Sequence, residues 1–247
     1  MARLAVLSDV HGNRLALEAV REAVRLAAPD VVAVAGDLAF NGPDPAGTVD
    51  LLRDMEAGGA LVIAGNTDIA VADFDYTAAF PSFPDGVPDH FRAAAEWAHG
   101  ALGPDRVEWL RGLPAERRIR IDGTLVIVCH ASPGSQTAGF DQGLDPTATL
   151  DRVSGTDAKV ICCGHTHIPE IREMGWRVIV NDGSAGYVFD GDPRASWAMI
   201  DVVEDHVTPE IKRVEYDVLA AADAVAERGL PGDVYRAATI RTGKLVR

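Results

Sequence analysis

Side chains that commonly bind metal ions occur in five short blocks of this chain. The blocks are residues 8–13 (SDVHGN), 36–37 (GD), 65–68 (GNTD), 129–130 (CH) and 164–167 (GHTH). The candidate ligands in these blocks are Asp9, His11, Asp37, Asn66, His130, His165 and His167. Imidazole nitrogens combined with carboxylate and amide oxygens suit a pair of divalent metal ions. The residue types therefore predict a hydrolytic metal centre.

The spacing inside the blocks supports this interpretation. Asp9 and His11 are two residues apart, as are His165 and His167, so in extended backbone both members of each pair would point the same way. Each pair alone is also typical of an ordinary surface turn. The amide of Asn66 has an oxygen for a hard cation and an NH₂ group for a phosphate oxygen. Only the five blocks together favour one shared site.

Every block follows a run of apolar residues, and these runs predict the elements that position the site. The runs are residues 4–7, 31–35, 61–64, 125–128 and 160–161. Continuous apolar runs of this length are typical of buried strands in an α/β protein, where ligands gather beyond the carboxyl ends of the strands. We therefore expect five strand ends to bring the seven candidate ligands to one edge.

Helix signals lie between the first three runs. Asn13 is expected to cap a helix that ends near Pro29, and Asp44 with Pro45 to begin a second helix that stops at Gly58. The first 66 residues therefore predict a β-α-β-α-β arrangement.

The character of the chain changes over residues 67–118. Residues 74–88 are rich in Phe, Pro and Asp without a clear period and predict an extended loop, followed by a helix from about Asp89 to Ala101. This insert could form a lid over the site or cover one face of a sheet. Strands are expected at residues 119–121, 125–129, 160–162, 177–180, 197–202 and 209–214, followed by a last helix at 217–226. One domain over residues 1–247 accounts for all of these elements.

The charge balance limits the class of partner. The chain has 23 Lys and Arg against 37 Asp and Glu, so the net charge is 23 − 37 = −14. This surplus repels phosphate backbones and makes long nucleic acid an unfavourable partner. Bound divalent cations would reverse the local sign and admit a small anionic substrate. The oligomeric state is left open by the sequence.

The cysteines and the apolar runs indicate the compartment. Cys129, Cys162 and Cys163 have no disulfide-framework spacing and are expected to be buried, reduced thiols. There is no signal-peptide pattern, and no run approaches the roughly 20 apolar residues needed to cross a bilayer. A cytoplasmic protein with no membrane partner is expected.

The five blocks, in their order along the chain, and the later NDGSAG at residues 181–186 resemble the motifs of the calcineurin-like metallophosphoesterase superfamily. The resemblance is to its small bacterial and archaeal phosphodiesterase-type members in particular. The resemblance implies an α/β fold, a four-layer α/β/β/α sandwich of two mixed sheets flanked by helices. It implies that a metal-bridging hydroxide attacks the phosphorus atom of a small phosphate ester.

The resemblance also implies a role for each residue of the blocks. The first metal would be held by Asp9, His11 and His167, the second by Asn66, His130 and His165, with Asp37 bridging. Asn66 would also offset charge in the transition state, and Asn13 and Thr67 would contact the substrate. Manganese or iron suits this ligand set, with zinc, nickel or cobalt as alternatives.

One residue departs from the pattern of the superfamily. Many members have Gly-Asn-His-Asp, whose His is proposed to protonate the leaving oxygen, whereas this chain has Thr67 at that position. Losing a general acid typically costs about 100- to 10,000-fold in rate when the leaving group is basic. We therefore expect small phosphodiesters or activated phosphate esters as substrates, in preference to alkyl monoesters. Specificity is expected to lie in residues 67–118 and in the loop at 132–141.

The alternative function is a non-catalytic metal-binding scaffold or protein-interaction module. The superfamily includes a protein-sorting scaffold subunit with a weakened site, and Thr67 would fit such a loss of activity. The complete set of seven ligands favours the enzyme, because a scaffold without a catalytic role has little reason to keep it.

Overall fold

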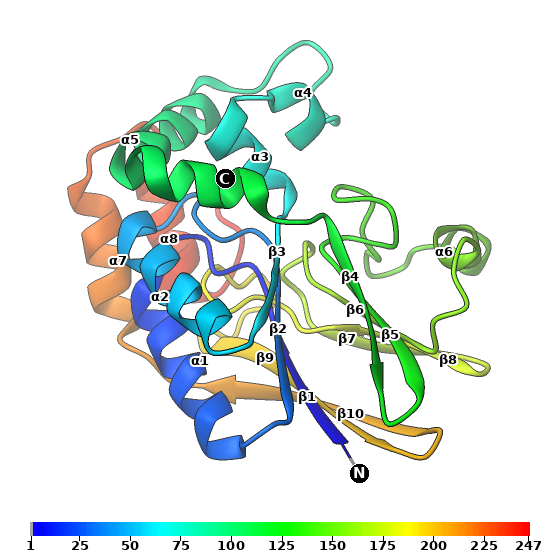
Figure 1. The fold of residues 1–247 in the computed structure, drawn as a ribbon. Coiled ribbons are helices and arrows are strands. Elements are labelled where there is room, and N and C mark those ends of the chain that lie inside the picture. The colour runs from blue at the N-terminus through cyan, green and yellow to red at the C-terminus, as the bar shows by residue number, and fades with distance from the viewer. Residues whose placement is uncertain (1) are drawn as a thin grey trace.

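The computed structural model describes residues 2–247, which form two five-stranded mixed sheets packed face to face with helices on the outer faces (Figure 1). The first sheet has the order β10-β9-β1-β2-β3 and the second the order β4-β5-β6-β8-β7. The strands of the first sheet are β1 (Ala2–Leu7), β2 (Val31–Ala35), β3 (Leu61–Ile63), β9 (Ala195–Val203) and β10 (His206–Val214). Those of the second are β4 (Glu116–Ile121), β5 (Thr124–Cys129), β6 (Val160–Cys163), β7 (Glu170–Met174) and β8 (Arg177–Asn181). The expected four-layer α/β/β/α sandwich is confirmed.

Three adjacent strands of each sheet run parallel. β1 pairs with β2 and β2 with β3 in parallel, and β5, β6 and β8 do the same in the second sheet. The connections of the first sheet are α1 (Arg14–Ala27) and α2 (Pro45–Ala57). Asn13 accepts a hydrogen bond from the Ala16 amide and Asp44 one from the Gly47 amide, which confirms both predicted helix starts.

Alternate residues of these strands separate the core into layers. Leu4 and Ala33 belong to the cluster between the sheets, together with Val126 of the second sheet. Their neighbours Ala5 and Val34 face outward into the cluster that holds α1, α2 and α5. On the far side of the second sheet, the outer cluster includes Val153 of α6 (Pro146–Val153). Burial on both faces explains why the central strands have continuous apolar sequences.

The segment at residues 67–118 differs from the sequence prediction. The expected extended loop at residues 74–88 contains a short helix, α4 (Tyr76–Ala79), and a helix that was not predicted, α3 (Asn66–Asp73), precedes it. The expected helix from Asp89 to Ala101 continues to Gly112 as α5, with a kink where Gly103 has φ 69° and Pro104 follows. The backbone of Gly103 is non-helical, so the two halves of α5 meet at this kink. α5 packs against α2 and α3, so this segment covers the outer face of the first sheet.

The C-terminal residues form a helical pair on the same side. Asp217 caps α7 (Val218–Glu227) as expected, but a further helix, α8 (Asp233–Thr242), was not predicted, and neither were β7 and α6. The side chains of Arg228, Asp233 and Arg236 are almost fully buried and pair with one another. Such burial of charge requires partners, and Arg228 also donates to the backbone oxygens of Asn41 and Gly42. The helical pair is therefore fastened to the loop that follows β2.

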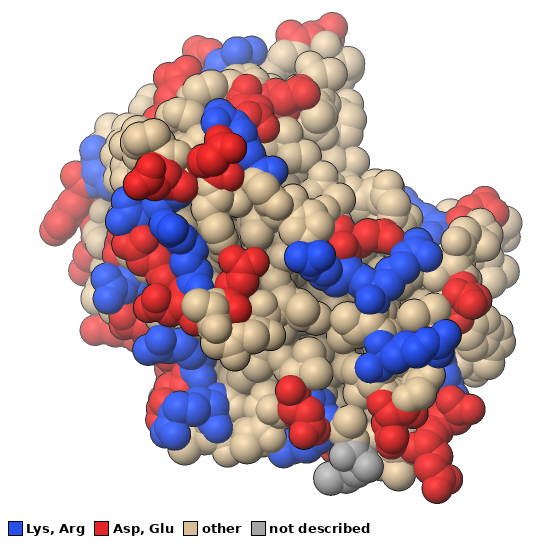
Figure 2. All heavy atoms as spheres, viewed as in Figure 1, with Lys and Arg blue, Asp and Glu red and all other residues tan. Residues whose placement is uncertain are grey.

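Most charged side chains and the cysteines lie where their types would place them, on the surface and in the core respectively. On the face seen in Figure 2, acidic and basic side chains are intermingled over the helical side. Cys129, Cys162 and Cys163 are buried and not disulfide-bonded, as expected. Within residues 2–247, none of the helices has the length and apolar character required to cross a membrane.

Candidate metal centre

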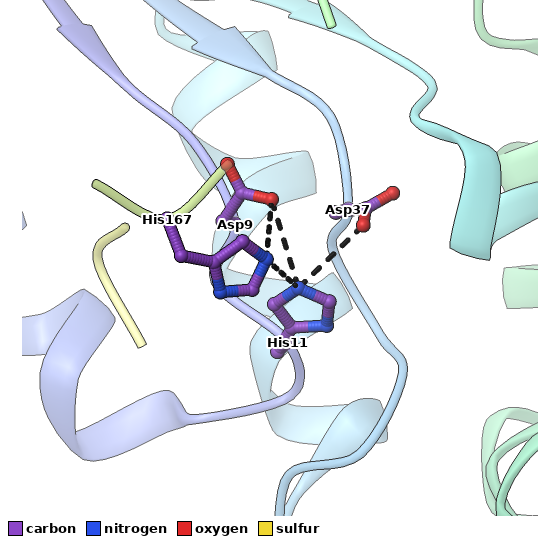
Figure 3. Close-up of side chains that lie close together, drawn as sticks. All are labelled: Asp9, His11, Asp37 and His167. Atoms are coloured by element: carbon purple, nitrogen blue, oxygen red, sulfur yellow. Dashed lines mark hydrogen bonds and ion pairs between the residues drawn. The ribbon is translucent and has the colours of Figure 1, made fainter. Parts of the chain in front are cut away.

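Four buried side chains converge at the ends of β1, β2 and β6. The ligand-type atoms of Asp9, His11, Asp37 and His167 all lie within 4.8 Å of one another, and the side chains point toward a common centre (Figure 3). Nε2 of His167 lies 3.1 Å from Oδ1 of Asp9 and 3.1 Å from Nε2 of His11. Nε2 of His11 lies 3.5 Å from Oδ2 of Asp37. The structure thus brings together four of the seven predicted ligands.

The other three predicted ligands form a second group beside the first. Oδ1 of Asn66 lies 3.0 Å from Nε2 of His130 and 3.1 Å from Nδ1 of His165, and these two nitrogens are 3.2 Å apart. Nε2 of His130 is also 3.3 Å from Oδ1 of Asp37. The two oxygens of Asp37 therefore face different groups, Oδ2 toward His11 and Oδ1 toward His130.

The backbone presents these side chains in a way that the sequence did not predict. Asp9, His11, Asp37, His165 and His167 all have positive φ, between 52° and 70°. We expected extended backbone for Asp9–His11 and for His165–His167, and this was wrong. The left-handed conformation is unfavourable for non-glycine residues, although Asp and His adopt it more readily than most, and it gathers at functional sites. It turns each loop sharply just after its strand.

Three imidazoles are oriented by backbone carbonyl groups. Nδ1 of His11 lies 3.1 Å from the Phe40 oxygen, Nδ1 of His130 lies 2.8 Å from the Ala35 oxygen, and Nδ1 of His167 contacts the Tyr187 oxygen. A carbonyl oxygen can only accept, so each Nδ1 carries the proton and each Nε2 presents a lone pair to the centre. His165 is the exception, because its Nδ1 faces the group.

The charge and hydrogen bonding of the predicted ligands fit a bound cation. Nε2 of His11 and Nε2 of His167 face each other at 3.1 Å, a contact that requires a positive charge, from a proton or a metal ion, near both nitrogens. Against the effect of burial, the carboxylate of Asp9 raises the pKa of His167, so this site attracts positive charge. The side chain of Asp9 is fully buried, and its Oδ1 has no hydrogen-bond partner. Burial, with repulsion from His130, lowers the pKa of His165 to about 4, which keeps this imidazole neutral near pH 7. These features fit divalent metal binding.

Asp9 is held by a backbone amide and by two residues outside the predicted ligand set, Ser8 and Asp182. Its Oδ2 accepts hydrogen bonds from the His165 amide and from the Ser8 hydroxyl, whose oxygen is also 2.6 Å from Oδ1 of Asp182. The Ser8 hydroxyl thus lies between the two carboxyl groups, and burial raises the pKa of Asp182 well above its ordinary value. A Cβ atom on Gly164 would collide with Ser8 and Asp9, so glycine permits the close approach. The NDGSAG motif was the sequence signal for Asp182.

Asp68 joins the loops that follow β2 and β3. Its Oδ2 accepts hydrogen bonds from the Gly65 and Asp37 amides, and its Oδ1 accepts one from Leu38. Burial and the nearby carboxylate of Asp37 raise the pKa of Asp68 to about 7, against the opposite effect of the amide donors. A Cβ atom on Gly65 would collide with Asp37, so these two loops touch. Asp68 thereby positions both Asp37 and Asn66.

Three predicted substrate or catalytic residues have different surroundings. Nδ2 of Asn66 donates to the Ala79 oxygen at 3.0 Å, which occupies one of the two N–H groups expected for a phosphate. Thr67 lines the cavity beside the centre, and its hydroxyl is buried without a hydrogen-bond partner. The amide of Asn13 is fully buried and donates to the Gly186 oxygen and to Tyr216. This gives Asn13 a capping and packing role and leaves it out of the cavity.

Comparison with known proteins identifies the family. The model of the calcineurin-like phosphoesterase superfamily domain matches residues 2–205. An uncharacterized protein of Methanocaldococcus jannaschii is 27% identical over 243 residues, which cover 92% of this chain and 93% of that protein.

Two solved structures resemble the fold. A metallophosphoesterase from Sphaerobacter thermophilus is 27% identical with a TM-score of 0.71, covering 96% of this chain and 98% of that one. A hypothetical protein from Pyrococcus horikoshii has a TM-score of 0.84 at 22% identity, covering 98% and 99%. With the family match over most of its length, this chain belongs to the calcineurin-like phosphoesterase superfamily.

Proposed function

We propose that this protein is a phosphoesterase that uses two divalent metal ions to hydrolyse small phosphodiesters or activated phosphate esters. The observation that supports this most is the position of Asp37, whose two oxygens face two separate groups of donors. A carboxylate in that position can bridge a pair of cations. Asp9, His11 and His167 would complete the first set of ligands, and Asn66, His130 and His165 the second.

The chain contributes orientation and charge to this chemistry. Divalent cations bound there would lower the pKa of a water molecule between them and neutralise charge on the phosphoryl oxygens. The carbonyl groups that fix His11, His130 and His167 hold the imidazoles in the neutral tautomer that binds metal through Nε2. Manganese or iron is the preferred metal for these nitrogen and oxygen donors.

Thr67 and Asn66 are proposed to contact the phosphate. The Thr67 hydroxyl is without a partner and can donate to a phosphoryl oxygen, and the remaining N–H of Asn66 can do the same. Neither group is acidic enough to protonate a basic leaving oxygen at neutral pH. Esters with an acidic leaving group, which departs as the anion, are therefore the favoured substrates.

The alternative, a metal-binding scaffold with the same fold, would not need this arrangement. The ligands, the carbonyl groups that orient them and the carboxylate of Asp68 are all in place, at the cost of five residues in left-handed backbone. Strain of this kind is retained where function requires it. We therefore rank the enzyme first.

The proposal is tested by hydrolysis of bis-p-nitrophenyl phosphate by metal-stripped protein reloaded with Mn²⁺. We expect release of p-nitrophenolate that depends on added metal and disappears in the His130→Ala variant. The exposed His206 lies outside the site, so His206→Ala is the matched control and should retain the wild-type rate. Absence of turnover with Mn²⁺, Fe²⁺, Zn²⁺, Ni²⁺ and Co²⁺ would favour the scaffold.

A further inference from the structure

The metal centre lies on the floor of a cavity that is much larger than a phosphate group. The cavity has a volume of about 900 Å³ and is lined by predicted ligands such as His11, Asp37 and His165. Pockets of about 300–1,000 Å³ in proteins enclose ligands of drug or cofactor size. The space above the centre is therefore sufficient for a large organic group attached to the phosphate.

One wall of the cavity is aromatic and comes from the segment at residues 67–118. Phe80, Phe83 and Phe91 line it together with Phe40 of the loop after β2. The rings of Phe80 and Phe91 meet edge to face at 5.0 Å between centroids, and those of Phe83 and Phe91 lie 5.6 Å apart. These contacts fix the rings against one another, so the wall is formed before any ligand enters.

A second aromatic wall comes from later parts of the chain. Tyr187, Phe189 and Tyr235 line this side. The ring of Phe189 stacks on the predicted ligand His167 at 4.1 Å and 12° between planes, so the aromatic surface reaches down to the metal centre. Tyr235 belongs to α8, which lies beyond the part of the chain that matches the family model.

Apart from the predicted ligands, the charged side chains that line the cavity are Asp89, Arg236 and Arg247. Asp89 and Arg247 are exposed, whereas Arg236 is buried and already engaged. Arg236 donates from Nε to Oδ1 of Asn41 and from a terminal nitrogen to the backbone oxygen of His90. It also pairs with Asp233. These bonds fasten α8 to the segments that form the first wall and leave the guanidinium little capacity for a ligand. The upper cavity is thus suited to an apolar group rather than to a sugar or a charged peptide, which would leave hydroxyl or ionic groups without partners.

We propose that the substrate carries a planar, apolar ring system of about two fused rings on the phosphate, and that this group lies between the two aromatic walls. The inference rests on the proposed function, because the phosphate is placed on the metal centre. Aromatic side chains attract flat π-systems by stacking and by edge-to-face contact, beyond simple burial of area. The loop at residues 132–141, where we also expected specificity, contributes none of the described residues that line the cavity.

The test compares two diesters that share one leaving group, methyl p-nitrophenyl phosphate and 2-naphthyl p-nitrophenyl phosphate. In both, water attacks phosphorus and the bond to p-nitrophenolate breaks, which releases the dye and leaves methyl or naphthyl phosphate. Because the leaving group is the same, the ratio of kcat/KM values reports the group that stays on the phosphate. We expect the naphthyl ester to be favoured by about 10- to 100-fold, the gain from burying an aromatic side chain.

Variants of the two walls locate the effect. Phe83 and Tyr235 are 39% and 50% exposed at the rim, so Phe83→Ala and Tyr235→Ala should fold and should lower the naphthyl-to-methyl ratio several-fold. Trp176 is 59% exposed and lies outside the cavity, so Trp176→Ala is the matched control and should keep the wild-type ratio.

The outcomes separate the two proposals. Equal kcat/KM values for the two esters, with clear turnover of both, would overturn the ring-binding inference and leave the phosphoesterase intact. If neither ester reacts, the phosphoesterase proposal fails, and calorimetry of 2-naphthyl phosphate against methyl phosphate with Mn²⁺-loaded protein still decides the inference. Tighter binding of the naphthyl compound, weakened by Phe83→Ala, supports it, and equal affinity contradicts it.

Discussion

Asp37 and His130 belong to different sheets, yet Oδ1 of Asp37 lies 3.3 Å from Nε2 of His130. Asp37 follows β2 in the first sheet, and His130 follows β5 in the second. His130 also donates from Nδ1 to the Ala35 oxygen at the end of β2, which fixes the two strand ends together. The candidate metal centre therefore depends on how the sheets pack, as well as on each loop.

Replacing Asp37 should remove metal from both groups at once. Asp37→Asn keeps the size of the side chain but removes the negative charge and one of the two acceptor oxygens. We expect bound Mn²⁺, measured by atomic absorption after gel filtration, to fall well below the wild-type amount and phosphodiester hydrolysis to fall by at least about 100-fold. Asp205→Asn, at an exposed side chain distant from the centre, is the control. Wild-type turnover in Asp37→Asn would refute the bridging role.

Introducing an acid at Thr67 should change which esters are hydrolysed. The Thr67 side chain is buried beside the centre and lines the cavity, so Thr67→His places an imidazole where a leaving oxygen could be protonated. We expect hydrolysis of alkyl phosphate monoesters to rise relative to that of bis-p-nitrophenyl phosphate by about 10-fold or more. Thr67→Asn, which adds a polar group without acidity, serves as the comparison. An unchanged ratio in Thr67→His would mean that the missing acid does not determine the preference.

Asp68 should be important for stability and for metal affinity without touching the metal. Asp68→Asn replaces one acceptor oxygen by an NH₂ group that faces backbone donors. We expect a loss of about 1–3 kcal/mol in the free energy of unfolding, measured in urea, and weaker Mn²⁺ binding. Asp75→Asn is the matched control, because Asp75 also accepts from a backbone amide at a helix start but is exposed. Equal effects of the two substitutions would contradict the role of Asp68 in stability and in metal affinity.

The metal-free protein should lose stability in acid through His165. Burial lowers the pKa of this imidazole from 6.5 to about 4, so between these values the unfolded chain binds a proton that the folded protein does not. The free energy of unfolding should therefore fall as the pH drops from 6.5 to 4, with His165 contributing up to about 3 kcal/mol. Urea titrations across this range should show a shallower fall for His165→Gln. Parallel curves for the two proteins would contradict the assigned shift.

Local signals in the sequence predicted the central strands and the residues that follow them, whereas the sandwich was implied by the resemblance to the superfamily. Continuous apolar runs marked the central strands, and each run ended at a block of ligand-type side chains such as Asp9 or His130. The left-handed backbone at these residues was not foreseen. It results from the packing of loops against one another, and no local pattern specifies it.

The cavity could not be predicted because its walls come from distant segments. Phe83 lies in a stretch without periodicity, and Tyr235 lies in a helix whose apolar stripe is weak. Their proximity depends on Arg236, which binds both the loop after β2 and the backbone of His90. Contacts of this kind are visible only when the chain is folded. Similarly, Nδ1 of His165 faces the centre where the other imidazoles use Nε2.

A crystal structure of the Mn²⁺-loaded protein, with anomalous diffraction data at the manganese edge, tests the central claim most directly. Two anomalous peaks are predicted, one beside His11 and His167 and the other beside His130 and His165, with the carboxylate of Asp37 in contact with both. A single peak, or two peaks of which one has no contact with Asp37, would contradict the paired centre.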